Sequence, residues 1–359
     1  MLFALGVLLN ELKVMSNGVL YVYLVVVFTL QSGLYFKFFS VPLHKVTSQI
    51  AALIAGKPYK KLNLSKRDEF GLLAYFFNDV TKNVENISYY LKEGERMASE
   101  LQIASDIQKS VLPVSIPLVE KMDTVAKTRS ADEVGGDSFA IVQRGTDYFM
   151  YIGDVTGHGA PAGLIMMMVN TLFDVMLPMY QTTYDLAVNI NKVLKPRVNS
   201  TMFMTTNFLK WDSANEVLTF TGAGHEHILI YRANEGVCEA IPAGGIALAM
   251  AEDISQIVQE KQITLNDQDV IVLYSDGITE AVNSEGGLYG LERLKESFKN
   301  HGHLANSLDI FENLSADIQA FVGDEVQNDD MTLMVLRYVK AGYVPEQKEF
   351  LVSTNWTAA

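Results

Sequence analysis

Four short segments of the sequence combine aspartate with glycine or with a run of β-prone residues. In the second and third segments the β-prone run leads into an aspartate beside glycine, and in the fourth an aspartate pair leads into such a run. The four segments are residues 131–137 (ADEVGGD), 151–159 (YIGDVTGHG), 270–277 (VIVLYSDG) and 328–336 (NDDMTLMVL). Strand ends hold side chains rigidly, and glycine lets the backbone approach a cation or a phosphate closely. We therefore expect the aspartates of these segments to act as ligands.

Several aspartates that converge on one place repel one another unless cations lie between them. Hard oxygen ligands of this kind select Mg²⁺ or Mn²⁺ rather than zinc. Two such ions about 3.5–4 Å apart activate a water molecule and clamp a phosphoryl group for in-line attack. Each segment alone also fits a simple turn after a strand. Taken together, the four segments predict a two-metal centre for phosphoryl chemistry.

The composition restricts the possible partners. The 359 residues include 28 Lys and Arg against 42 Asp and Glu, a formal net charge of −14. This balance argues against nucleic acid as a partner, because phosphate backbones need a basic face. Cys238 is the single cysteine, so the chain can form neither an internal disulfide framework nor a cysteine-based zinc site. This cysteine usage suits a reducing cytoplasm.

The elements that must position these aspartates begin with an apolar run. Residues 18–36 carry no formal charge over nineteen positions, and as a helix they would extend about 28 Å, close to the thickness of a bilayer. Lysines follow at positions 37, 45, 57, 60 and 61. The positive-inside rule then predicts an anchor in the inner (cytoplasmic) membrane with the catalytic domain in the cytoplasm. A cleaved signal peptide and a buried core helix are the alternatives.

Residues 41–112 have the pattern of helix, loop and helix. Pro42 begins the first helix, residues 56–66 form the connector, and Asp68 and Glu69 open the second helix, where its dipole favours acidic side chains. Apolar or small residues then recur in +4/+3 steps at Leu73, Phe77, Val80, Val84, Ile87, Leu91, Gly94, Ala98 and Leu101. Such a heptad seam needs a partner helix and predicts a homodimer. Beyond Leu101 the apolar phase shifts to Ala104, Ile107 and Val111.

This part of the chain resembles a HAMP linker, the module that couples membrane receptors to cytoplasmic outputs. The resemblance rests on the order of a membrane span, Pro42, a helix, a loop and the sequence Asp68-Glu69-Phe70-Gly71 at the start of a second helix. A plain coiled-coil stalk would produce the same seam.

Residues 101–338 resemble the SpoIIE/RsbU branch of the PPM (protein phosphatase 2C-like) metal-dependent serine/threonine phosphatases. Seven ordered segments carry the likeness: residues 103–113 (IASDIQKSVLP), 134–137, 153–159, 221–225 (TGAGH), 244–245, 273–280 and 329–332. The resemblance implies an α/β (α+β) sandwich of two β-sheets flanked by helices, with metals at one rim. The Met-rich residues 161–180 are expected to form a helix that packs in its core.

The resemblance assigns Asp137, Asp154, Asp276 and Asp329 as the catalytic metal ligands of two Mn²⁺ or Mg²⁺ ions. Asp137 would bridge both ions, and the backbone carbonyl of Val155 would add an oxygen. Ala140 stands where many members carry a further aspartate. His158 lies four residues after Asp154, so the role of general acid is not transferred to it, and it stays open as a turn residue or a catalytic acid. His225 and His227 are expected to line a strand end.

The implied substrate is a phosphorylated STAS-domain anti-sigma-factor antagonist in bacterial signal transduction. The rival function is a catalytically inactive scaffold that binds such a partner or a nucleotide. The expected organisation is a membrane-anchoring segment (1–37), a HAMP-like linker (38–91), a coiled-coil linker helix (92–112), a PPM-type phosphatase domain (113–340) and a C-terminal tail (341–359).

Overall fold

The computed structural model describes residues 17–63, 68–111 and 117–340. The first part of the predicted anchoring segment (1–16) and the predicted tail (341–359) lie outside these residues. The chain divides into two compact units between Met97 and Ala98. This division falls inside one long helix, α4 (Glu69–Val111).

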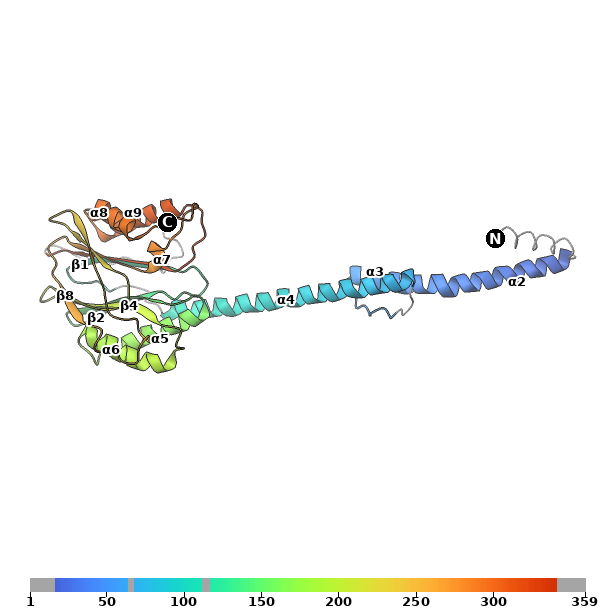
Figure 1. The fold of residues 1–359 in the computed structure, drawn as a ribbon, viewed down its shortest axis with the longest axis horizontal. Coiled ribbons are helices and arrows are strands. Elements are labelled where there is room, and N and C mark those ends of the chain that lie inside the picture. The colour runs from blue at the N-terminus through green and yellow to red at the C-terminus, as the bar shows by residue number, and fades with distance from the viewer. Residues whose placement is uncertain (1–16, 64–67, 112–116, 341–359) are drawn as a thin grey trace. The chain divides into compact units, whose positions relative to one another are not determined.

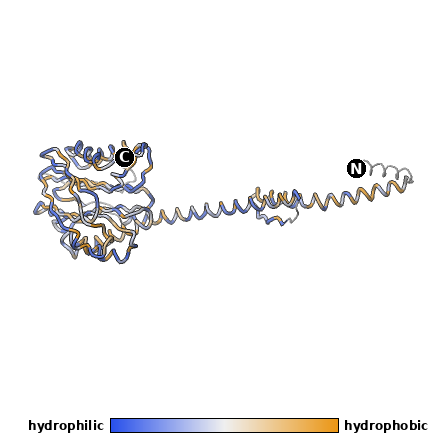
Figure 2. Tube along the Cα trace, in the orientation of Figure 1, coloured by the Kyte–Doolittle hydropathy of each residue, from blue (hydrophilic) through white to orange (hydrophobic). Residues whose placement is uncertain are grey.

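The first unit is helical. It contains α2 (Asn17–Tyr35), a short π-helical turn (Phe36–Ser40), α3 (Val41–Ile54) and the first part of α4. Within the described residues, Gly18–Ile54 is one helical stretch long and apolar enough to cross a membrane, with a mean hydropathy of 1.8 in its most apolar window and none of that window buried. Figure 2 shows the hydrophobic colour along α2. A candidate membrane span is therefore present where the sequence predicts one.

The predicted helix–loop–helix is confirmed. Asp68 Oδ1 accepts a hydrogen bond from the Gly71 nitrogen at 3.0 Å and so satisfies one of the free N–H groups at the start of α4. The described part of the connector contacts α4, where Asn78 exchanges two hydrogen bonds of 2.9 Å with the backbone of Leu62. Phe77 is buried under the Tyr59 ring. One position of the predicted heptad seam thus packs within its own chain.

The second unit contains two five-stranded antiparallel sheets. One sheet has the order β1-β10-β9-β6-β7 and the other has the order β2-β3-β4-β5-β8. The strands of the first sheet are β1 (Met122–Arg129), β10 (Met331–Tyr338), β9 (Val270–Tyr274), β6 (Ile228–Arg232) and β7 (Val237–Ile241). Those of the second are β2 (Ser138–Arg144), β3 (Asp147–Val155), β4 (Met204–Asp212), β5 (Val217–Ala223) and β8 (Glu260–Ile263).

Helices cover the outer face of each sheet (Figure 1). The helices α5 (Ala160–Met176) and α6 (Thr183–Leu194), followed by a short 3₁₀ turn (Lys195–Arg197), pack on the sheet that contains β3 and β4. On the other sheet lie α8 (Leu291–His301) and α9 (Ser307–Val322), and the single turn α7 (Asp276–Thr279) follows β9. The predicted sandwich of two sheets flanked by helices is confirmed.

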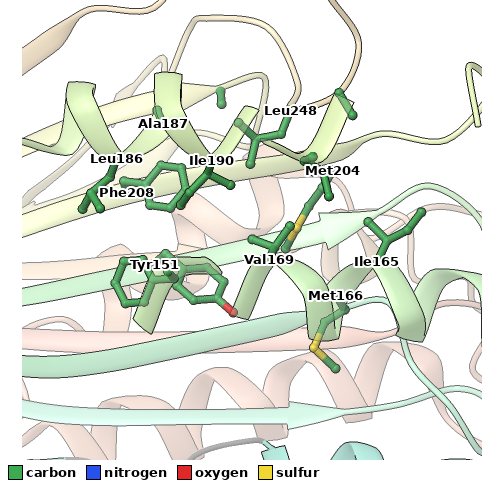
Figure 3. Close-up of a cluster of buried hydrophobic side chains, with 14 of the residues drawn as sticks. Tyr151, Ile165, Met166, Val169, Leu186, Ala187, Ile190, Met204, Phe208 and Leu248 are labelled. Atoms are coloured by element: carbon green, nitrogen blue, oxygen red, sulfur yellow. The ribbon is translucent and has the colours of Figure 1, made fainter. Parts of the chain in front are cut away.

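Side-chain alternation along the strands produces this layering, because successive residues of a strand point to opposite faces. In β3, Met150 and Ile152 belong to the core between the two sheets, whereas Phe149 and Tyr151 belong to the core under α5 and α6. Figure 3 shows the helix-covered core, with Met166 of α5 beside Tyr151 and Val169. Met166 is fully buried there, as predicted for a core residue, whereas Met179 is 68% exposed.

Candidate metal centre

The four predicted ligands lie where strands of both sheets begin or end. Asp137 immediately precedes β2, and Asp154 is the penultimate residue of β3. Asp276 follows β9 as the first residue of α7, and Asp329 lies two residues before β10. The sheets are stacked, so one rim of the sandwich receives carboxylates from both layers.

Asp137 is buried and held by two hydroxyl groups from the opposite sheet. Ser275 Oγ and Thr332 Oγ1 each donate a hydrogen bond of 2.6 Å to its Oδ2 atom. Its Oδ1 atom is buried and has no hydrogen-bond partner among the described residues. Burial and then the charges of neighbouring aspartates raise the pKa of Asp137 well above its usual range, and the two hydroxyls oppose this rise. One oxygen of Asp137 is therefore positioned and the other is left for a ligand.

Asp330 organises the loop that carries Asp137. Its Oδ2 atom accepts hydrogen bonds from the backbone nitrogens of Gly136 at 2.6 Å and Asp137 at 3.3 Å, and its Oδ1 atom accepts one from Ala131 at 2.7 Å. A Cβ atom on Gly135 would lie 2.5 Å from the Asp330 Oδ2 atom, so this glycine is required for the close approach. Asp330 thus serves as a positioning residue, while its neighbour Asp329 faces the other carboxylates.

The remaining carboxylates affect one another electrostatically. The pKa of Asp154 rises to about 8, first through burial and then through nearby aspartate charges. Those charges belong to Asp276, Asp329 and Asp330. Burial and then the charge of Asp329 raise the pKa of Asp276 to about 6. The structure therefore brings all four predicted ligands into one cluster whose charges repel, which is the electrostatic signature of a cation site.

The oxygen donors of this cluster fit Mg²⁺ or Mn²⁺. Asp276 Oδ1, like Asp137 Oδ1, is buried with no hydrogen-bond partner among the described residues. The carbonyl oxygen of Val155 borders the same loop, since a Cβ atom on Gly136 would lie 3.0 Å from it. Within the described part of the chain, no three His, Cys, Asp or Glu side chains converge closely enough to hold an ion unaided. The carboxylates alone therefore do not complete a metal site in this arrangement, and a Mg²⁺ or Mn²⁺ ion held here would need waters as further ligands.

The end of helix α4 contacts the same loop. The side chain of Gln108 is buried, its Nε2 atom donates to the Gly135 carbonyl oxygen at 2.6 Å, and its Oε1 atom accepts from the Gly135 nitrogen at 3.2 Å. Ser105, one turn earlier, is also buried, whereas Ile107 is 52% exposed. The apolar pattern after Leu101 therefore does not identify the buried residues of this part of the helix. The buried residues are the polar Ser105 and Gln108 instead.

The histidines and Ala140 have no direct place among the carboxylates. His158 is exposed, and its Nδ1 atom lies within hydrogen-bond distance of Asp132 Oδ2, at 2.8 Å, so it contacts the loop before β2 at the surface. Burial lowers the pKa of His225 to about 4, and its Nδ1 atom lies 2.9 Å from the Thr205 hydroxyl, beside Asp154. Ala140 packs in the core under α5 and α6, where a carboxylate would be buried among apolar side chains.

Sequence reasoning missed the roles of Gln108, Ser275, Thr332 and Asp330. Each of these residues lies inside or next to a segment that carries the family resemblance. Their roles depend on the hydrogen bonds described above, which join segments up to 199 positions apart, and no local spacing indicates such bonds. In the sequence, Gln108 could have been noticed as a polar residue at the end of the helix that leads directly into the domain.

A sandwich of two antiparallel sheets with a carboxylate cluster at one rim defines the class of PP2C-like (PPM) phosphatases. A family model described as stage II sporulation protein E (SpoIIE) matches residues 144–339, more than half of the chain. The chain belongs to this family and is a protein phosphatase.

Two curated relatives are similar to this chain. Phosphoserine phosphatase RsbU of Bacillus subtilis is 27% identical over 243 residues, which are 68% of this chain and 71% of that protein. Protein IcfG of Synechocystis is 24% identical over 329 residues, which are 83% of this chain and 51% of IcfG. The chain therefore spans about half the length of IcfG.

Solved structures show the same fold. The SiaA-PP2C domain of Pseudomonas aeruginosa matches with a TM-score of 0.59 and 19% identity, covering 69% of this chain and 98% of that one. The RsbU and RsbW domains of Rv1364c from Mycobacterium tuberculosis match with a TM-score of 0.55 and 21% identity, covering 65% of this chain and 64% of that one.

Proposed function

We propose that this chain is a membrane-bound, metal-dependent serine/threonine phosphatase that acts on a phosphorylated STAS-domain anti-sigma-factor antagonist. Asp137, Asp154, Asp276 and Asp329, with the carbonyl oxygen of Val155, would hold two Mn²⁺ or Mg²⁺ ions. The observation that carries the proposal is the cluster of buried carboxylates at one rim, where Asp154 has a pKa of about 8 and two carboxylate oxygens are without partners among the described residues. Cations relieve that repulsion directly.

The residues around the ions have distinct tasks in this proposal. Bound ions would supply an activated water and neutralise the phosphoryl charge. The hydroxyls of Ser275 and Thr332 hold Asp137 in one orientation and favour its ionised form. Asp330 holds the loop that carries Asp137, because it accepts hydrogen bonds from the backbone nitrogens of Gly136 and Asp137. Asp276 and Asp329 supply carboxylates from the other sheet and complete the site.

The substrate assignment rests on the relatives. RsbU carries the name phosphoserine phosphatase, and the SpoIIE/RsbU likeness implies a STAS-domain partner. The net charge of −14 supports a protein rather than a nucleic acid as the partner.

Hydrolysis assays with the full chain in detergent test the activity. We expect Mn²⁺-dependent hydrolysis of p-nitrophenyl phosphate and of a phosphoserine STAS-domain protein, with loss of both on addition of EDTA. Any shortened version should begin at Ala98 rather than at residue 113, because Gln108 contacts the site loop. Tight binding of the phosphorylated partner without turnover of either substrate would favour the inactive scaffold.

The membrane assignment rests on the apolar helix. We propose that Gly18–Ile54 contains the span and that the lysines after α2 keep the catalytic domain in the cytoplasm. The full chain should stay in the membrane fraction after high-salt and carbonate washing. Recovery of most of the protein in the soluble fraction would contradict the anchor.

The homodimer and the five-part organisation (1–37, 38–91, 92–112, 113–340, 341–359) also belong to this proposal. Along α4 the seam residues Leu73, Val84, Ile87 and Leu91 are between 44% and 64% exposed. A partner helix would cover them. Cysteine substitution at Ile87 should give a disulfide-linked dimer in membranes, and substitution at Lys82, which lies off the seam, should not.

A further inference from the structure

A cavity of about 370 Å³ opens beside the candidate metal centre. Two chain segments line it, one from Gly277 to Leu288 and the other from Val322 to Met331. Ala281 and Met331 form a buried apolar part of the lining, whereas Leu288 and Val326 are 62% and 82% exposed. Large apolar side chains exposed at the mouth of a cavity are a typical feature of a binding site.

Hydrogen bonds hold both walls in place. Leu288 forms an antiparallel bridge with Val282, and the Asn283 side chain accepts a hydrogen bond of 2.8 Å from the Gly287 nitrogen. On the other wall, Gln327 Nε2 donates to the carbonyl oxygens of Arg129 at 2.8 Å and Asp329 at 2.7 Å. The exposed apolar side chains therefore sit on a backbone that is ordered before any partner binds, which lowers the entropic cost of binding.

The cavity is contiguous with the carboxylate cluster. Asp329 belongs to both the lining and the cluster, and Gly277 follows Asp276 directly. A Cβ atom on Gly277 would lie 2.1 Å from the Asp330 carbonyl oxygen, so the wall and the loop before β10 are in tight contact. Glu280 is the charged residue of the lining that is not among the proposed metal ligands, and its negative charge complements a basic partner.

We propose that this cavity recognises the substrate segment that flanks the phosphorylated residue. It takes one apolar side chain between Leu288 and Val326, and a basic side chain of the same segment faces Glu280. Because Asp329 belongs to both the cavity lining and the carboxylate cluster, a phosphorylated residue at the cluster would bring the residues next to it in the substrate chain to the cavity. This inference rests on the proposed phosphatase function and assigns the residues that select the substrate.

A set of phosphoserine peptides tests the proposal with the full chain in detergent and Mn²⁺. A single Leu or a single Arg is moved through the three positions on each side of phosphoserine in a Gly/Ala host. We expect one Leu position and one Arg position to raise kcat/KM about tenfold over the host peptide, since a well-placed apolar contact discriminates by that order. The Leu preference should disappear in Leu288→Ser and Val326→Ser, and the Arg preference in Glu280→Gln.

The peptide turnover is expressed relative to p-nitrophenyl phosphate turnover of the same variant, so that a general loss of activity does not imitate lost recognition. Ile257→Ser is the matched control, because Ile257 is 48% exposed and lies outside the cavity lining. Its peptide preferences should equal those of the original chain. The absence of any Leu preference in the original chain, or its retention in both apolar variants, would overturn the inference.

Failure of the phosphatase function gives a different result. In that case p-nitrophenyl phosphate is not hydrolysed by the original chain. Fluorescence anisotropy of a labelled phosphoserine peptide still compares the original chain with Leu288→Ser and Ile257→Ser without turnover. Equal affinity for all three proteins would overturn the recognition site independently of catalysis.

Discussion

The side-chain amide of Gln108 bonds both backbone groups of Gly135, at 2.6 Å through its nitrogen and 3.2 Å through its oxygen. Gly135 lies two residues before Asp137, so the end of helix α4 is joined by hydrogen bonds to the loop that carries the proposed bridging ligand. We therefore expect a displacement of this helix within the second unit to move the Asp137 loop through the Gln108 side chain.

Replacement of Gln108 by Ala should weaken metal binding. Its loss leaves the Gly135 backbone groups without these partners and loosens the Asp137 loop, and residues that support metal ligands typically change affinity 10–100-fold. We expect the Mn²⁺ concentration for half-maximal p-nitrophenyl phosphate hydrolysis to rise about tenfold. Gln102→Ala is the matched control, because Gln102 is an exposed glutamine of the same helix. The same Mn²⁺ dependence in both variants would contradict the role of Gln108.

Asp276→Asn and Asp137→Asn should each reduce Mn²⁺-dependent turnover about a hundredfold or more, because each removes a charge that holds an ion. Both proteins should remain folded, with a melting temperature in the absence of metal at least equal to that of the original chain. The reason is that each substitution relieves repulsion within the cluster. Asp253→Asn, at an exposed position away from the rim, is the control. Near-normal turnover in both rim variants would show that the ligand assignment is wrong.

Ser275→Ala and Thr332→Val should shift the pH profile of activity. The two hydroxyls lower the pKa of Asp137, so their removal raises that pKa and leaves more Asp137 protonated at low pH. Activity at a fixed, subsaturating Mn²⁺ concentration should fall several-fold more at pH 6 than at pH 8.5. Ser213→Ala removes a buried hydroxyl elsewhere in the domain and should leave the profile unchanged. Equal losses at both pH values would assign the hydroxyls a purely structural role.

The metal-free chain should become less stable as the pH rises from 4 to 8. The pKa values of Asp154 and Asp276 in the folded chain are about 8 and about 6, above the unfolded value of about 3.9. At these two carboxyl groups the folded chain binds more protons than the unfolded chain in this window, which outweighs the opposite effect of the lowered pKa of His225. Stability is therefore lost as the pH rises through the folded pKa values of the two aspartates. Thermal melts in EDTA should show this decline, and Mn²⁺ should largely remove it. A melting temperature of the metal-free chain that rises between pH 5.5 and 8 would contradict the raised pKa values of these aspartates.

Insertions after Leu91 test whether α4 transmits rotation. A helix turns about 100° per residue, so seven added residues return the seam to within roughly 20° of its register, whereas four rotate it by about 40°. At equal expression in membranes, the four-residue insertion should change phosphatase output far more than the seven-residue insertion. Equal phosphatase output from the two insertion variants would indicate that the N-terminal segment only anchors the protein in the membrane.

The layered fold was predictable because seven ordered segments of the sequence resemble one phosphatase family, and the structure has the two sheets that this resemblance implies. The same resemblance assigned the candidate ligands, and the aspartate segments pointed to them because aspartates beside glycine or β-prone runs suit the ends of strands. The roles of Gln108 and Asp330 were not predictable in this way. Their partners are the backbone groups of a loop on another element, and hydrogen bonds to a backbone leave no periodic trace in the sequence. The apolar pattern beyond Leu101 likewise gave no indication that the polar residues Ser105 and Gln108 are buried at the end of α4.

Strand β10 lies between β1 and β9 in its sheet, and Thr332 at its start donates a hydrogen bond to Asp137, 195 positions earlier. An inner strand of this sheet, which also completes the hydrogen bonds around Asp137, is therefore synthesised long after Asp137 itself. At about 5–20 residues per second, the interval between Asp137 and Thr332 is roughly 10–40 s of translation. Ser275 and Asp276 are translated earlier, but until β10 is made Asp137 lacks the hydrogen bond from the Thr332 hydroxyl. We therefore expect the nascent chain to remain inactive until β10 has joined the sheet.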